Sequence, residues 1–187
     1  MLTSLRTAFR LGSAPRLSLV GAGGKSISLF RLAREYDAAV LLGSTAHLSL
    51  AQADLADRHV VALTTSDIKA LTNDPACVTL LTGADNGKGR WSSLPQEVLP
   101  ALYQLADEWQ APLLFESDGS RCLPLKAWGE HEPPIPAGVD TVVVCSGLSG
   151  LGAPLDEEHV FRAETFSQLS ALPLNSPVTP DALAAVL

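Results

Sequence analysis

The sequence predicts a three-layer α/β fold, in which a mostly parallel sheet carries helices on both faces. Short segments that are apolar throughout alternate with segments of helical periodicity, and such strands are typical of a parallel sheet covered on both sides. A glycine-rich stretch also joins the first apolar segment to the first helical one, as in folds built from strand–turn–helix units. The predicted strands span residues 17–20, 38–42, 60–63, 78–81, 112–116 and 141–145.

Helical periodicity and capping residues predict the remaining elements. Pro95 stands near the start of the longest helical pattern. Near the C-terminus, Thr179 is expected to cap a helix whose first residue is Pro180. Because this last helix stops after two turns, we expect a chain that is naturally short or truncated at its C-terminus. The predicted helices span residues 2–9, 27–34, 51–58, 95–109, 157–169 and 182–187, and the predicted loops 83–89 and 123–136.

Length and composition predict a single domain over residues 1–187 and exclude some partners. The formal net charge of −7 argues against a nucleic-acid or membrane partner, because phosphate backbones and anionic lipids require clustered Lys and Arg. No apolar run is long enough to span a membrane, and we find no secretory signal. Cys77, Cys122 and Cys145 lack paired spacing, which indicates reduced thiols and a cytoplasmic protein.

The glycine-rich stretch predicts a phosphate-binding loop. Amides at a helix N-terminus bind phosphate, a following lysine neutralises its charge, and a hydroxyl binds Mg²⁺. The common pattern has a further glycine where Leu19 stands, so this shorter form is similar to the loop of Mur ligases. An ordinary strand–helix turn with a surface lysine is the alternative. The residues expected to bind the nucleotide are Gly21, Ala22, Gly23, Gly24, Lys25 and Ser26, with Lys25 also catalytic and Ser26 also a metal ligand.

One carboxylate ends the strand predicted at residues 112–116, and a second stands two residues further on. An acid at the end of an apolar strand commonly faces nucleotide-bound Mg²⁺, and ligands of open parallel sheets bind beyond the carboxyl ends of strands. We therefore expect Glu116 and Asp118 to bind the metal or orient the attacking nucleophile. A solvated Asp-Gly turn is the alternative for Asp118.

Hydroxyl and basic residues extend the candidate site. Ser44 and Thr45 follow the second strand and either meet the terminal phosphate or cap a helical turn. Basic residues in and beside the proline-rich loop either bind an anionic second substrate or partner, or are solvated without a specific role. Those basic residues are Arg121, Lys126 and His131. His159 and Arg162 are expected to share a helix face, with a solvated face as the alternative.

Three segments resemble the selenium-dependent hydroxylase accessory protein family, which is also called YqeC-like. These are GAGGKS at residues 21–26, ESDGSRCLPLK at 116–126 and EHEPPIP at 130–136, which resemble the family's GAGGKT, EADGSRxLPLK and EHEPVIP. Weaker likeness at residues 147–155, 158–162 and 176–187 extends the resemblance over nearly the whole chain from residue 17. The middle segment is the most specific of these.

The resemblance implies a cytosolic P-loop nucleotide-binding protein, with a P-loop NTPase-like fold, that is associated with maturation of selenium-dependent molybdenum hydroxylases. It implies nucleotide and Mg²⁺ binding at the loop, metal or nucleophile roles for the two acids, and a second half of the site. That second half would contain Arg121, Lys126, His131, His159 and Arg162. The chain departs from the family where a lysine usually follows the second strand, because His47 ends that stretch here.

Three functions are compatible with these residues. The first is Mg²⁺-dependent hydrolysis of ATP or GTP, or transfer of its phosphoryl group, in an accessory factor whose partners are a molybdenum hydroxylase or its maturation factors. The second is a binding module in which nucleotide orders the loops at residues 43–47 and 117–135 without turnover. The third is a Mur-ligase-like ATP-dependent ligase.

Overall fold

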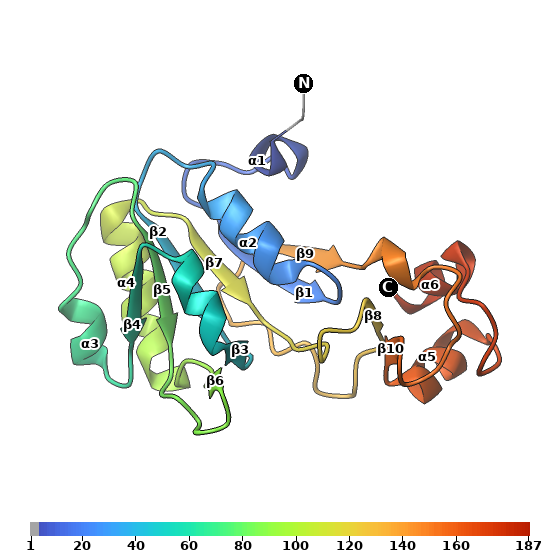
Figure 1. Cartoon of the computed structure of the whole chain (residues 1–187). Helices are drawn as coiled ribbons and strands as arrows, with labels where there is room; N and C mark the ends of the chain where they lie inside the picture. The colour runs from blue at the N-terminus through green and yellow to red at the C-terminus, as the bar shows by residue number, and fades with distance from the viewer. Residues whose placement is uncertain (1–3) are drawn as a thin grey trace.

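The computed structural model describes residues 4–187 and is built around a six-stranded sheet in the order β4-β5-β2-β7-β1-β9 (Figure 1). All neighbouring strands pair in parallel, and helices cover both faces, so the predicted α/β fold is confirmed. The strands are β1 (Arg16–Gly21), β2 (Val40–Ser44), β4 (Arg58–Val61), β5 (Val78–Thr82), β7 (Leu113–Glu116) and β9 (Thr141–Cys145).

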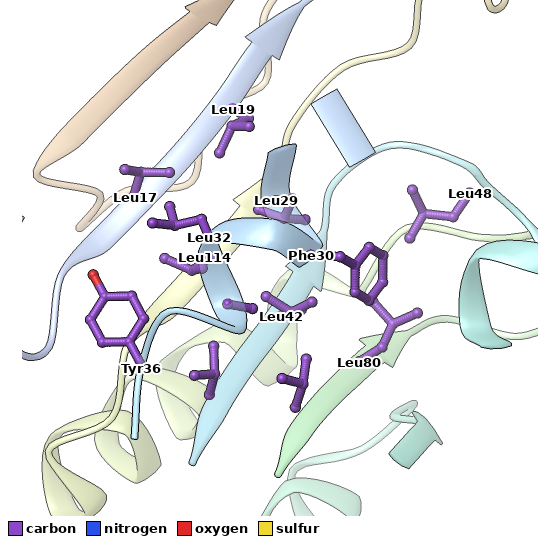
Figure 2. Packing of buried hydrophobic residues seen from close by; sticks show 13 residues of the cluster. Leu17, Leu19, Leu29, Phe30, Leu32, Tyr36, Leu42, Leu48, Leu80 and Leu114 are labelled. Atoms are coloured by element: carbon purple, nitrogen blue, oxygen red, sulfur yellow. The ribbon is translucent and has the colours of Figure 1, made fainter. Parts of the chain in front are cut away.

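Helix α2 (Lys25–Ala33) covers one face of the sheet. Figure 2 shows Leu29 and Phe30 of α2 over Leu42 and Leu114 of the sheet, and all four belong to one buried cluster. The side chains of a strand alternate between faces, so the next residue along β7, Phe115, points to the opposite side. This alternation between two buried clusters explains why the strands are apolar throughout.

Helices α3 (Thr65–Lys69) and α4 (Leu99–Trp109) cover the other face. A 3₁₀ turn over Gln96–Val98 leads into α4, within the predicted 95–109. Gly43 of β2 lies opposite Phe115 of the neighbouring strand β7, and a Cβ on Gly43 would lie 2.6 Å from Cε1 of Phe115. The Phe115 ring therefore occupies this buried cluster because the neighbouring strand has no side chain at that position.

The C-terminal segments lie beyond the carboxyl ends of β1 and β9, at the right of Figure 1, and we call them the C-terminal lobe. They enclose a third buried cluster, which includes Leu125, Leu155, Val160 and Phe166. The backbone of the lobe is β8 (Leu125–Lys126), β10 (Val160–Phe161), α5 (Ala163–Ser170) and α6 (Pro180–Val186), and β8 pairs in parallel with β10. Thr179 caps α6 as predicted, by accepting a hydrogen bond from the Ala182 amide.

Several predicted boundaries were wrong. The helix expected at residues 51–58 is a 3₁₀ helix, Leu50–Leu55, because the chain is extended at Ala56 and then enters β4. The helix expected at 157–169 begins only at Ala163, since Arg162 has a left-handed backbone (φ 63°) that no right-handed helix includes.

The expected loop at residues 123–136 contains a short strand, β8, and another short strand, β6 (Arg90–Trp91), directly follows the expected loop at 83–89. Strand β6 pairs in an antiparallel manner with β3 (Leu48–Ser49). The N-terminal helix is α1 (Leu5–Ala8), with part of the predicted 2–9 outside the described residues.

We predict that Leu42→Ala lowers the free energy of unfolding by about 2–5 kcal/mol, because it opens a cavity in the cluster under α2. The matched control is Leu174→Ala, whose side chain is 46% exposed and whose effect we expect within about 0.5 kcal/mol. Urea denaturation followed by circular dichroism measures both. Equal effects of the two substitutions would contradict the packing described here.

Candidate functional site

Three glycines of the loop between β1 and α2 have left-handed backbones, and at Gly21 and Gly23 a side chain would also have no room. Gly21 and Gly23 have φ angles of 97° and 72°, in the left-handed region. A Cβ on Gly21 would lie 2.2 Å from the Cys145 carbonyl oxygen, and one on Gly23 would lie 2.4 Å from the Gly147 Cα. The Ala22 amide donates to that same Cys145 oxygen at 2.9 Å, so β9 fixes the loop at the end of the sheet.

The side chain of Lys25 folds back under the loop. Its Nζ donates to the Gly21 carbonyl oxygen at 2.6 Å and lies 3.3 Å from Oδ1 of Asp118. The residue is 5% exposed, although it opens α2. An ammonium group this well buried requires a carboxylate partner, and Asp118 supplies one.

Ser26 and Glu116 meet across the loop. The Ser26 hydroxyl donates to Oε2 of Glu116 at 2.7 Å, and the Gln52 side-chain amide donates to the same hydroxyl oxygen. Burial raises the pKa of Glu116 above its ordinary value, and the Ser26 hydrogen bond and the nearby Lys25 charge oppose this rise only in part. A hydroxyl beside a carboxylate, at the mouth of a cleft, is the donor pair that Mg²⁺ uses together with waters and substrate phosphates.

Asp118 is enclosed by donors. Its carboxylate accepts hydrogen bonds from the Gly21 amide at 2.9 and 3.0 Å, from Nζ of Lys126 at 2.9 Å and from Nε1 of Trp128 at 2.8 Å. Together with the Lys25 ammonium these contacts use most of the lone pairs of a carboxylate. They hold the end of β1, the start of α2 and the start of the C-terminal lobe at one point.

The chain of charges continues into the C-terminal lobe. Lys126 donates at 2.9 Å to Oε2 of Glu132, and the Arg162 guanidinium donates to both oxygens of Glu132 at 2.6 and 3.0 Å. Burial raises the pKa of Glu132, but the hydrogen bonds from Arg162 and Lys126 outweigh it and the net pKa is lowered. Glu132 is therefore held as a carboxylate between two cations.

A cleft of 310 Å³ opens beside the loop. Of the predicted residues it is lined by Gly23, Gly24, Lys25, Ser26, Glu116 and Arg121. It is also lined by three residues that sequence reasoning did not include in the site, His47, Gln52 and Arg90. Arg90 lies on β6, His47 directly precedes β3, and Gln52 lies in the 3₁₀ helix that follows β3. The strands β3 and β6 are two residues long, and no motif in the sequence signals that they pair.

Other predicted residues lie elsewhere. The Thr45 hydroxyl donates to the Pro134 carbonyl oxygen at 2.9 Å, Lys126 is buried behind Asp118, and the His131 side chain is exposed. Their contact with a nucleotide stays a prediction. His159 and Arg162 do not share a helix face, because both precede α5: His159 pairs with Asp156 at 2.7 Å, and Arg162 pairs with Glu132.

Comparison with known proteins places this loop and these charges in a family. A family model described as "YqeC protein" matches residues 17–164. The chain belongs to the YqeC family. The match includes the glycine-rich loop, Glu116, Asp118 and the whole charge chain to Arg162, so the resemblance seen in the three sequence segments is confirmed.

A curated relative of the YqeC family is "Uncharacterized protein YqeC" of Escherichia coli (strain K12). The two are 32% identical over 173 residues, which cover 89% of this chain and 62% of the relative. This chain thus spans less than two thirds of the length of that protein. No solved structure matches the chain.

Two further observations on this YqeC family member concern membrane-spanning helices and clusters of metal-binding side chains. Within residues 4–187 no helix is both long and apolar enough to cross a membrane. The same described residues hold no group of three or more His, Cys, Asp or Glu side chains placed to bind a metal ion. A metal at Ser26 and Glu116 would therefore depend on oxygens from water and substrate, as Mg²⁺ commonly does.

We predict that Glu116→Gln stabilises the free protein at neutral pH. The pKa of Glu116 is raised in the folded state, so at a pH above that pKa the buried, charged carboxylate disfavours folding. Below the pKa of the unfolded chain the group is protonated in both states, and this penalty disappears. The urea midpoint of the variant should exceed that of the unmodified chain at pH 8, and the gap should shrink as the pH falls toward 4. A gap that widens toward acid pH would contradict the assignment.

We predict that Asp118→Asn lowers the free energy of unfolding by about 3–5 kcal/mol, because two buried ammonium groups then lose their shared carboxylate. Asp181→Asn is the control, since Asp181 is exposed in the first turn of α6. Urea denaturation at pH 7 measures both variants. A loss no larger than that of the control would show that the two lysines do not depend on Asp118.

Proposed function

We propose that the chain binds the triphosphate of ATP or GTP with Mg²⁺ and hydrolyses it or transfers its terminal phosphoryl group. One observation carries the proposal: a strand end, a glycine turn and a helix N-terminus bring free amides, a buried ammonium and a hydroxyl–carboxylate pair to one cleft. The amides of Gly23 and Gly24 donate to no backbone carbonyl among residues 4–187. Such amides at a helix N-terminus suit an anionic phosphate.

Lys25 supplies the charge in this proposal. Its ammonium leaves the Gly21 carbonyl for the phosphate oxygens when nucleotide binds, which exchanges a neutral acceptor for an anionic one. A hydrogen bond from an ammonium to phosphate has a charge on both partners, whereas the bond to Gly21 has a charge on the donor only, so the exchange is favourable. In the transition state the same ammonium and the loop amides stabilise negative charge on the transferring group.

Ser26 and Glu116 would hold Mg²⁺, and the bound ion would neutralise part of the phosphate charge. Glu116 is also the carboxylate that we assign to orientation of the attacking nucleophile, because it lines the cleft. Asp118 was predicted for the same roles, but its oxygens already accept from Gly21, Lys126 and Trp128. We assign to Asp118 the positioning of the loop and of Lys25.

We place this nucleotide site in an accessory factor for the maturation of selenium-dependent molybdenum hydroxylases. Membership of the YqeC family and the resemblance of residues 116–126 and 130–136 support this context. A nucleotide-switched binding module without turnover is a second candidate, favoured by the contacts that join the loop to the C-terminal lobe through Asp118, Lys126 and Glu132.

We predict that Lys25→Ala weakens binding of Mg²⁺–ATP or Mg²⁺–GTP about tenfold or more, because a charge-assisted hydrogen bond is lost. Titration calorimetry with each triphosphate, with and without Mg²⁺, measures the affinity, and a phosphate-release assay measures turnover. The control is Lys88→Ala, a solvent-exposed lysine outside the cleft lining. Thermal unfolding without nucleotide verifies that the Lys25 variant is folded.

The two assays separate the candidates. Lys25-dependent binding together with Lys25-dependent phosphate release supports an enzyme, and binding without release supports the switched module. If neither triphosphate produces heat with the folded, unmodified chain, the proposal fails.

A further inference from the structure

The cleft beside the phosphate loop has basic side chains that the loop does not supply. His47 follows β2, Arg90 lies on β6 and Arg121 follows β7, and all three line the cleft together with Lys25 and Ser26. They come from three separate segments of the chain. The tertiary structure, and not a local run of basic residues, therefore brings them together.

Arg90 is fixed relative to the loop by the short sheet that carries it. Strand β6 pairs with β3, where Arg90 lies opposite Ser49. Gln52 follows in the 3₁₀ helix, and its side chain accepts from the Ser49 amide and donates to the Ser26 hydroxyl. The wall that bears Arg90 is thus tied to the second residue of α2.

Arg121 is fixed by an aromatic ring of the C-terminal lobe. Its guanidinium carbon lies 4.8 Å from the ring centroid of Phe161, in the geometry of a cation–π contact. Arg121 and Cys122 have consecutive left-handed backbones, with φ angles of 53° and 65°, which form the tight turn that brings Arg121 over the ring. The ring restricts the guanidinium and leaves its N–H groups free to bind a ligand.

The charges around the cleft are unbalanced. Arg162 lies over the same Phe161 ring at 4.9 Å, but its charge is paired with Glu132. Arg90 and Arg121 form no salt bridge with any residue in the described range 4–187. Glu116 is the one carboxylate in the cleft lining, and the whole chain has a net charge of −7. Two unpaired guanidinium groups on one cleft of an acidic protein favour an anionic ligand there.

We infer that Arg90 and Arg121 bind the oxyanion of a second small substrate, a phosphate or a carboxylate, beside the nucleotide. Planar guanidinium groups bind both anions through paired N–H donors, so the shared chemistry is that of a small oxyanion. The inference rests on the proposed function, since it assigns the loop amides and Lys25 to the nucleotide. The second anion would then lie in the same cleft beside Arg90 and Arg121. The two guanidinium charges would offset its repulsion by the triphosphate.

The test uses protein saturated with Mg²⁺ and a non-hydrolysable analogue of whichever triphosphate binds. Inorganic phosphate and malonate are titrated separately by calorimetry into the unmodified chain and into Arg90→Gln and Arg121→Gln. We expect one of the two anions to bind, and its Kd to rise about tenfold or more in each variant, because each loses charge-assisted bonds. The anion that binds tells phosphate from carboxylate. Arg31→Gln is the control, an exposed arginine outside the cleft lining.

The other outcomes either overturn the inference or show that the proposed function, and not the inference, has failed. Nucleotide binding with no binding of either anion, or with equal anion affinity in all variants, overturns it. Loss of nucleotide affinity in both glutamine variants also overturns it, because the arginines then hold the nucleotide itself. If no nucleotide binds, the proposed function fails, and titration of the free protein still decides whether an anion depends on Arg90 and Arg121.

Discussion

The shared carboxylate of Asp118 is the interaction on which the rest of the site depends. It holds the ammonium groups of Lys25 and Lys126, both nearly excluded from solvent, together with the Gly21 amide. Without it, the buried Lys25 ammonium would have no carboxylate partner among the described residues, and Lys126 would keep only Glu132. An unpaired buried charge costs several kcal/mol. Because Lys25 opens α2 and Gly21 ends β1, one side chain fixes the geometry of the whole glycine-rich loop.

The order of the strands makes this interaction possible. Strand β1 lies between β7 and β9, so the loop after β1 meets the segment after β7, which carries Asp118, and is clamped by the Cys145 carbonyl at the end of β9. Ligands of parallel sheets bind where such loops converge beyond the carboxyl ends of the strands. The same edge receives the C-terminal lobe, whose Lys126 reaches Asp118 from outside the sheet.

Sequence reasoning succeeded where chemistry is encoded locally and failed where it depends on tertiary packing. Continuous apolar strands fix a parallel sheet, and adjacent residues fix the loop, which is why the fold and the positions of Lys25 and Ser26 in the cleft were predictable. Gln52 and Arg90 reach the cleft because β3 pairs with β6, and this pairing is only two residues long. Hydrophobic periodicity does not detect strands this short. The helix expected at residues 157–169 begins only at Ala163 because Arg162 has a left-handed backbone, and no residue pattern in the sequence signals that conformation.

The second buried lysine, Lys126, would allow Lys25 to bind the proposed nucleotide although Lys25 is buried. If Lys25 were the sole partner of Asp118, moving its ammonium to a phosphate would leave a bare carboxylate in the interior. Lys126 stays 2.9 Å from Asp118, and Trp128 and the Gly21 amide still donate to it, so that carboxylate remains compensated. Glu132 in turn balances Lys126 and is balanced by Arg162. The charge chain into the C-terminal lobe would therefore lower the cost of releasing Lys25 to the proposed nucleotide, and the lobe would support that site through its charges.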